Sequence, residues 1–174
     1  LTTLIHSIIL KIFGNEVLYL QIYTSLIYST TIILISFVVK KFTNQNLALL
    51  SIISLILIYP IPLKPWPIYN SYFFYTLSLI FFLKKENFAK IISGLSLSLA
   101  YLSFTTVYNF ILIPLILLII CFYVFFYYKN KLEIIKLVYF LIGVLLPILF
   151  FILYLINLEI LSYWILYQKI PILF

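Results

Sequence analysis

Long apolar runs alternate with short polar stretches along this chain of 174 residues. A hydrocarbon core of about 30 Å takes roughly 20 helical residues to cross. On that basis we expect membrane-spanning helices over residues 17–39, 47–59, 68–83, 88–107, 109–128 and 134–156. The second and third runs are short, so each either borrows flanking residues or forms part of a hairpin that dips into the membrane.

Residues 1–13 follow a different pattern. Apolar residues recur there at helical spacing, while Thr3, Ser7 and Lys11 occupy another face. The segment is too short to span, so it predicts an amphipathic helix in the membrane interface that ends at Gly14 and Asn15. The alternative is the truncated end of a spanning helix. The predicted fold class is all-α: a polytopic transmembrane helix bundle with about six spanning helices plus a short N-terminal interfacial helix.

The lysines predict the orientation of this bundle. Eight of the eleven fall into three clusters between apolar runs: Lys40 and Lys41, then Lys84, Lys85 and Lys90, then Lys129, Lys131 and Lys136. Two spans separate successive clusters, so all three lie on one side of the membrane. Because cationic loops stay on the cytoplasmic side, that side is predicted to be the cytoplasm. The chain is then an integral membrane protein, which we place in a bacterial inner or plasma membrane.

Composition excludes several other classes. Hydrophobic residues make up 66% of the chain, charged residues 9%, and the mean hydropathy is +1.26, which leaves too little polar surface for a soluble domain of this size. The net charge of +7 therefore reflects membrane topology and predicts no nucleic-acid partner. The lysines are expected to attract anionic lipid weakly. The chain starts at Leu1 and has no methionine, so we expect a single transmembrane domain over 1–174 that is a fragment of a longer protein.

Three local signals predict how the chain is organised between and within helices. Four prolines between residues 60 and 67 forbid a continuous helix and predict a stiff loop at the outer surface. Small residues at a spacing of four, Gly94 with Ser98 and Ser96 with Ala100, predict close helix packing within the molecule. Pro147 is expected to kink the last helix, and a neighbouring helix must shield the carbonyl that it frees.

Candidate chemistry is confined to polar residues on the predicted outer side. No phosphate-binding glycine loop, metal-ligand spacing or nucleophile motif occurs, and no metal or cofactor is predicted. The outer candidates are His6, Lys11, Glu16, Gln21, Lys64, Asn70, Asn109 and Glu159. Lys64 could meet a lipid phosphate or diphosphate, and Trp66 and Tyr69 could stack on a sugar ring. Anchoring in the membrane interface explains the same residues equally well.

The order of these features resembles one known family. Leu4 to Glu16, with its Phe-Gly-Asn-Glu ending, looks like the short helix and corner of the integral-membrane glycosyltransferases of the C-type fold, in particular bacterial relatives of the dolichyl-phosphate-mannose-protein mannosyltransferases. Lys40-Lys41-Phe42, Tyr59-Pro60, the Tyr69-Asn70 start of a helix, the 92–103 segment and the later Gly143, Pro147 and 157–163 segments follow in the family's order. The resemblance covers almost the whole chain and depends on order and spacing.

The resemblance implies a function and a set of site residues. A sugar would move from a polyprenyl-phosphate donor to an acceptor at the extracytoplasmic face of the cell envelope, with an acidic general base in a loop upstream of Leu1. This chain is then expected to lack the base and to contribute substrate-binding residues, for which Lys64, Trp66, Tyr69, Asn70, Glu16, Gln21 and His6 are the candidates. Gln21, Asn70 and Phe104-Thr105 replace charged or amide residues that relatives often carry, which indicates a divergent donor or acceptor, or lost activity.

Two other classes of protein remain open at this stage. A transporter or flippase of lipid-linked saccharides would need ionisable residues in the middle of helices and an internal repeat, and neither is apparent in the sequence. A non-catalytic structural membrane subunit is the other alternative. Both share the predicted topology, so the lysine pattern does not discriminate among the three.

Overall fold

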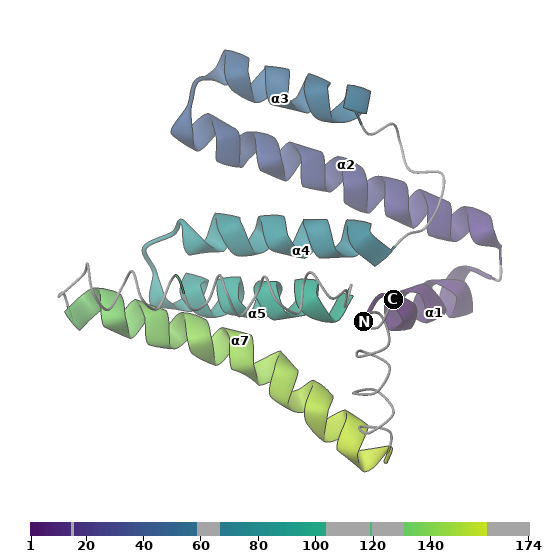
Figure 1. The fold of residues 1–174 in the computed structure, drawn as a ribbon. Coiled ribbons are helices and arrows are strands. Elements are labelled where there is room, and N and C mark those ends of the chain that lie inside the picture. Colours follow the sequence, from purple (N-terminus) through teal and green to yellow (C-terminus); the bar gives the residue numbers. More distant parts are fainter. Residues whose placement is uncertain (15, 59–66, 104–118, 120–130, 160–174) are drawn as a thin grey trace, which may run out of the picture.

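The computed structural model describes residues 1–14, 16–58, 67–103, 119 and 131–159, and this part of the chain is helical without strands (Figure 1). Its helices are α1 (Thr2–Phe13), α2 (Val17–Phe42), α3 (Gln45–Ile58), α4 (Pro67–Phe82), α5 (Asn87–Ser103) and α7 (Lys131–Asn157). The all-α prediction is confirmed for these residues. Apart from residue 119, the predicted span over 109–128 lies outside them, and so do the proline-rich loop at 59–66 and Lys129.

Helix boundaries follow local signals in the sequence. Gly14 ends α1 with a φ of +110°, and its N–H donates to the Leu10 carbonyl over 3.0 Å. Only glycine adopts such a conformation without strain, so the predicted corner after residue 13 is confirmed. The Asn44 side chain accepts a hydrogen bond of 2.9 Å from the Leu47 N–H and caps the start of α3. Proline occupies the first position of α4, where its missing N–H removes no helical hydrogen bond.

The larger helices lie side by side in the order α3, α2, α4, α5, α7 (Figure 1). Helices α4 and α5 form an antiparallel pair, because Ser71 hydrogen-bonds the Ala100 carbonyl and Ser78 lies 3.3 Å from the Ser93 hydroxyl further along. In Figure 1, α5 and α7 run in the same direction, whereas α1 lies at one end of the bundle. The interior of the bundle is thus built along α4, α5 and α7.

Backbones meet directly where α5 crosses α7. A Cβ atom added at Gly94 would overlap the Phe140 carbonyl oxygen, and one added at Gly143 would overlap the Ile91 carbonyl oxygen. The Ser98 hydroxyl donates to the Val144 carbonyl over 2.5 Å at the same crossing. The prediction that Gly94 and Ser98 serve packing within the molecule is confirmed. We call this crossing, with Gly94, Ser98 and Gly143 at its centre, the glycine seam.

The glycine seam lies beside the proline of α7. Pro147 has no N–H for the carbonyl four residues earlier, which belongs to Gly143. The next carbonyl along, that of Val144, accepts the Ser98 hydroxyl from α5. A neighbouring helix therefore supplies a donor to the carbonyl next to the one that Pro147 frees, while the shielding of the Gly143 carbonyl itself stays a prediction. Helix α7 continues to Asn157, and its C-terminal half diverges from α5 in Figure 1.

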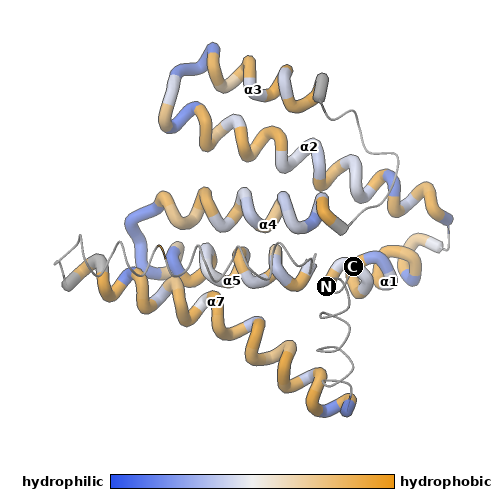
Figure 2. The backbone as a smooth tube through the Cα atoms, in the orientation of Figure 1, coloured by the Kyte–Doolittle hydropathy of each residue, from blue (hydrophilic) through white to orange (hydrophobic). Residues whose placement is uncertain are grey.

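Many polar side chains are buried and many large apolar side chains are exposed, which is the opposite of the usual distribution in a soluble protein. The buried residues include many hydroxyl groups, such as Ser71, Ser93 and Ser98 at 1% exposure or less, whereas large aliphatic and aromatic side chains are exposed along α2, α3 and α7. In water such a surface would be strongly unfavourable, since apolar area avoids water. Figure 2 shows the apolar residues along the helices and hydrophilic residues gathered toward the helix ends.

Two of the described helices are long and apolar enough to cross a membrane, namely Val17–Phe42 and Ile134–Asn157 within α7. Their 26 and 24 residues correspond to about 39 and 36 Å. Only 22% of the apolar window of each is buried, so neither is the enclosed core helix of a soluble protein. Helices α3, α4 and α5 have 14, 16 and 17 described residues, which is short of a full crossing. The structure therefore gives two helices of spanning length in its described part where the sequence predicted about six spans.

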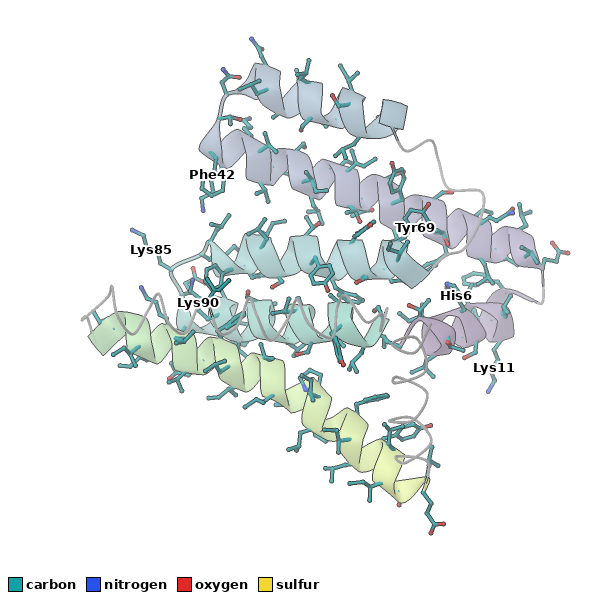
Figure 3. All side chains as sticks on the ribbon, in the orientation of Figure 1. His6, Lys11, Phe42, Tyr69, Lys85 and Lys90 are labelled. Carbon is teal, nitrogen blue, oxygen red and sulfur yellow. The ribbon has the colours of Figure 1, made fainter. Side chains whose placement is uncertain are left out.

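The lysine clusters gather at one end of the bundle. Lys40 and Lys41 lie in the last turn of α2, Lys84, Lys85 and Lys90 lie at the α4–α5 connection, and α7 begins at Lys131. Figure 3 shows Lys85 and Lys90 at this end and His6, Lys11 and Tyr69 toward the other. The Lys41 ammonium group donates to the Leu83 carbonyl over 3.3 Å, which joins α2 to the end of α4. We call this the lysine end and the opposite one the Asn70 end.

Threonine hydroxyl groups inside the helices bond to their own backbone. Thr24 donates to the Leu20 carbonyl and Thr31 to the Ile27 carbonyl, each over 2.7 Å. Thr30 and Thr76 do the same with the carbonyls four residues before them. These groups consequently have a hydrogen-bond acceptor without water or a second helix.

Candidate functional site

A buried asparagine joins four helices at the Asn70 end. Asn70 lies in the first turn of α4 and is 3% exposed. Its Oδ1 accepts a hydrogen bond of 2.8 Å from the Tyr23 hydroxyl of α2, and its Nδ2 donates over 3.3 Å to the Thr2 hydroxyl of α1. Thr2 in turn donates to the Ser103 carbonyl of α5 over 2.9 Å. We call Thr2, Tyr23, Asn70 and Ser103 the Asn70 network.

Two further hydrogen bonds hold the end of α5 against its neighbours. The Leu1 nitrogen donates to the Leu102 carbonyl over 3.0 Å, and the Ser71 hydroxyl donates to the Ala100 carbonyl over 3.0 Å. Because a buried polar group without a partner is costly, these bonds fix α1 and α4 on α5 in one arrangement. Every buried side-chain nitrogen and oxygen in the described part of the chain has a hydrogen-bond partner.

His6 lies next to this network. Its ring meets the Tyr23 ring edge to face, with centroids 6.1 Å apart and planes at 85°. Partial burial disfavours the charged imidazolium, so it lowers the pKa of His6 below its usual value of 6.5. His6 is therefore neutral at pH 7 and presents a ring nitrogen that can accept a proton or a hydrogen bond.

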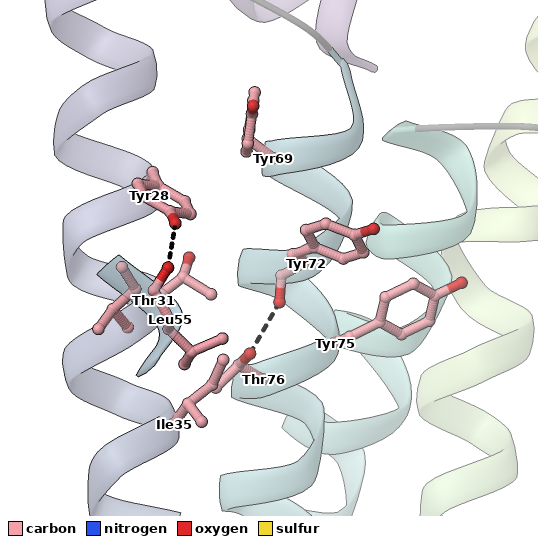
Figure 4. Close-up of a pocket in the computed structure, with 9 residues that line it drawn as sticks. Tyr28, Thr31, Ile35, Leu55, Tyr69, Tyr72, Tyr75 and Thr76 are labelled. Atoms are coloured by element: carbon pink, nitrogen blue, oxygen red, sulfur yellow. Dashed lines mark hydrogen bonds between the residues drawn. The ribbon is translucent and has the colours of Figure 1, made fainter. Parts of the chain in front are cut away.

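An aromatic cleft lies beside the network, between α2, α3 and α4 (Figure 4). Its cavity has a volume of about 300 Å³, and none of the described residues that line it is charged. The lining residues are Tyr28, Thr31, Ile32, Ile35, Leu55, Tyr69, Tyr72, Tyr75 and Thr76. The rings of Tyr28 and Tyr69 meet at a centroid distance of 5.6 Å, and the Tyr28 hydroxyl donates to the Leu55 carbonyl over 3.2 Å. We call this cavity the tyrosine cleft.

The lining of the tyrosine cleft limits what it can do. Thr31 and Thr76 direct their hydroxyl hydrogens to carbonyls of their own helices, so they offer the cleft little donor capacity. Aromatic faces and aliphatic side chains remain, and these surfaces suit the apolar face of a sugar ring or a hydrocarbon chain. With no ionisable carboxylate or imidazole in its lining, the cleft can bind and orient a ligand but supplies no general base.

The structure brings together some of the residues that the sequence predicted for the site. His6 and Asn70 are joined through Tyr23, and Tyr69 lines the adjacent cleft. Asn70 is not an open ligand-contacting residue, because both atoms of its amide are engaged within the protein; it positions the helices around it. The expected contact of Asn70 with substrate stays a prediction.

The remaining candidates are more dispersed or lie beyond the description. Glu16 is exposed at the start of α2, where its side chain makes no capping bond, and Gln21 is half-buried one turn later. Glu159 is exposed after α7 with a φ of 58°. Lys64 and Trp66 lie outside the described residues. The sequence did not predict a role for Thr2, Tyr23 or Tyr28. The signal that could have found them is the presence of tyrosine and threonine in α1 and α2, at positions that face the start of α4.

No protein-family model, curated protein or solved structure matches this chain in the comparisons made with each of them. Among the described residues, moreover, no group of three or more His, Cys, Asp or Glu side chains is placed to hold a metal ion. The functional argument therefore depends on the geometry of the Asn70 end and on the resemblance in the order of sequence features.

Proposed function

We propose that this chain belongs to an integral-membrane glycosyltransferase that moves a sugar from a polyprenyl-phosphate donor to an acceptor at the extracytoplasmic face. The observation that carries the proposal is the meeting of the segments that resemble the family. The 4–16 segment contributes His6 and the 69–74 segment contributes Tyr69 and Asn70, and Tyr23 connects them. Residues far apart in the chain thus form one polar and aromatic region.

Membrane insertion is supported by the surface of the helices. Two helices have spanning length, apolar side chains cover the outside, and hydroxyl groups fill much of the inside. Gathering of the lysines at one end supports a cytoplasmic position for that end. The Asn70 end is then extracytoplasmic, which is the side on which the family resemblance puts the reaction.

The proposed reaction assigns different roles to the two features of the Asn70 end. An acceptor oxygen forms a bond to the anomeric carbon of the donor, the bond from that carbon to the phosphate oxygen breaks, and polyprenyl phosphate leaves. The tyrosine cleft orients the donor through ring faces, and the Asn70 network holds the helices that line it. No residue of this chain is assigned as the base that takes the acceptor proton, because the resemblance locates that carboxylate in a loop before the 4–16 segment.

The charge distribution favours this proposal over a flippase. In α2, α3, α4, α5 and α7, the lysines and glutamates lie within the first two turns or the last turn. A flippase that moves a charged headgroup through the membrane needs ionisable or strongly polar groups at mid-depth. The buried polar side chains of the described bundle interior are hydroxyls and the Asn70 amide, all uncharged and with partners in the protein.

A transfer assay in proteoliposomes tests the proposal. The full-length protein, which carries this chain together with the loop before the 4–16 segment, and its Tyr69→Ala variant are supplied with a radiolabelled polyprenyl-phosphate hexose and an extract of cell-envelope acceptors. We expect labelled product with the wild type and about tenfold less with Tyr69→Ala, since loss of an aromatic face costs on the order of 1 kcal/mol. Tyr154→Ala, which removes a tyrosine exposed on α7, serves as the matched control and should keep full activity. The proposal fails if the wild type transfers no sugar, or if the two variants lose activity equally.

A further inference from the structure

A second cleft lies between α2 and α4 at the lysine end. Its cavity has a volume of about 240 Å³ and is lined by Leu34, Phe37, Val38, Lys41, Ile80, Leu83 and Lys84. Five of these residues are apolar and two are lysines, and no carboxylate is among them. Glu86, in the same α4–α5 connection, is not part of the lining. The cleft is therefore an apolar groove with an uncompensated positive rim, which we call the lysine cleft.

The two walls of the lysine cleft have the same design. On α2, Leu34, Phe37, Val38 and Lys41 follow a spacing of three and four residues, so they occupy one face of the helix. The other wall repeats that spacing with Ile80 on α4 and with Leu83 and Lys84, the two residues that follow α4. Each wall thus begins with aliphatic side chains and ends with a lysine, over a depth of about 10 Å along α2.

The cations at the rim have capacity for a ligand. Lys41 is exposed and has three N–H donors, one of which contacts the Leu83 carbonyl. The Lys84 ammonium group lies 5.0 Å from the centroid of the Phe81 ring, and its residue is exposed as well. Phe37 in the opposite wall is 62% exposed, so the groove is open to the hydrocarbon that would surround the bundle. A chain could enter from the side while its headgroup stays at the rim.

We propose that the lysine cleft binds an anionic glycerophospholipid, with its phosphate between Lys41 and Lys84 and one acyl chain along the apolar walls. A phosphate accepts hydrogen bonds from both ammonium groups, and the aliphatic walls match a hydrocarbon chain in length and polarity. A free phosphate would leave the apolar walls without a ligand, and a zwitterionic lipid has a cation that offsets its phosphate, so its headgroup brings no net negative charge to the two lysines. The proposal needs the chain to be inserted in a membrane but does not depend on sugar transfer.

Native mass spectrometry of the chain in mild detergent tests the site. The chain is titrated with phosphatidylglycerol and, separately, with phosphatidylcholine that carries the same acyl chains. We expect phosphatidylglycerol to bind at least tenfold more tightly to the wild type. Each lysine near an anionic headgroup contributes about fivefold in affinity, so Lys41→Gln/Lys84→Gln should lose about 25-fold for phosphatidylglycerol and little for phosphatidylcholine.

A charge-matched variant provides the control. Lys40→Gln/Lys85→Gln removes the same net charge from the same two connections, but neither residue lines the cleft. This variant should keep phosphatidylglycerol affinity within about threefold of the wild type. Equal losses in the two double variants would overturn the proposal, because they would show attraction by the lysine end as a whole. Inorganic phosphate or glycerol 3-phosphate binding as tightly as the lipid would overturn it too, since the acyl chain would then contribute nothing.

One further measurement separates this proposal from the preceding one. Washing membranes that contain the chain with alkaline carbonate should leave it in the pellet; release into the wash would overturn insertion and the lipid site together. A chain that stays in the pellet, prefers phosphatidylglycerol through Lys41 and Lys84, and transfers no sugar would support the lipid site alone.

Discussion

The glycine seam and the Asn70 network hold helices together by opposite means. At the seam, Gly94 and Gly143 let the backbones of α5 and α7 touch, and the Ser98 hydroxyl adds a bond to the Val144 carbonyl. At the network, the side chains of Thr2, Tyr23 and Asn70 join the helices with hydrogen bonds. Steric contact tolerates no added atom, whereas a polar bridge can be exchanged for another set of matched groups. The seam therefore fixes the bundle, and the network is the part that can differ between related sites.

Enlarging a seam glycine should have the largest effect. Gly143→Leu places a side chain where the Ile91 backbone lies, so α7 must separate from α5, and we expect a loss of about 3 kcal/mol in the free energy of unfolding. Thr30→Leu places the same leucine side chain at an exposed position of α2 and should change stability by less than about 0.5 kcal/mol. Thermal unfolding in detergent, followed by circular dichroism, measures both. Equal melting temperatures of the two variants would show that the seam is not a steric constraint.

Breaking the Asn70 network should have an intermediate effect. Asn70→Ala removes the acceptor of the Tyr23 hydroxyl and the donor to the Thr2 hydroxyl, which keeps its bond to the Ser103 carbonyl, and we expect a loss of about 2 kcal/mol. Tyr23→Phe in the same background should cost little more, because its hydrogen bond is already gone. A double-mutant cycle on the same unfolding transition measures this coupling. If the two single losses simply add, the two side chains do not act together.

The pH dependence through His6 should be the smallest effect. Burial lowers the pKa of His6 in the folded state, so the unfolded chain binds a proton more readily. Stability should then be constant above the unfolded value of about 6.5, fall as the pH decreases below it, and become constant again below the folded pKa. Melting temperatures measured from pH 8 to pH 4 test this, and His6→Gln should remove the slope in that range. A slope that His6→Gln leaves unchanged would assign the effect to another group.

Features that depend on one helix at a time were predictable from the sequence. The corner at Gly14, the proline at the start of α4 and the lysines at one end all follow from local residue chemistry, and the structure contains each of them. Helix α3 and helix α4 were also correctly predicted to be short for a crossing. Six spans stay a prediction, because two described helices have spanning length and most of the predicted span over 109–128 lies outside the described residues.

For contacts between two helices, the sequence indicated one of the two partners and not the other. Gly94 stood out as a small residue, but its partner Gly143 could be matched to it only once the register of α5 and α7 was known. Asn70 stood out by its position in the chain, yet its burial results from Tyr23 and Thr2, which are 47 and 68 residues away. Hydroxyl residues offered an unused signal: Ser71, Ser78 and Ser93 are all buried, so the serines of α4 and α5 mark the packed side of these two helices.

The threonines that bond their own helix have a consequence for how this chain enters a nonpolar solvent. Thr24, Thr30, Thr31 and Thr76 each direct the hydroxyl hydrogen to a carbonyl of the preceding turn. Their dehydration is therefore partly compensated before any tertiary contact exists. A count of polar atoms therefore overstates the free-energy barrier to inserting such a helix into a membrane. A newly made α2 can partition into lipid almost as if its threonines were valines.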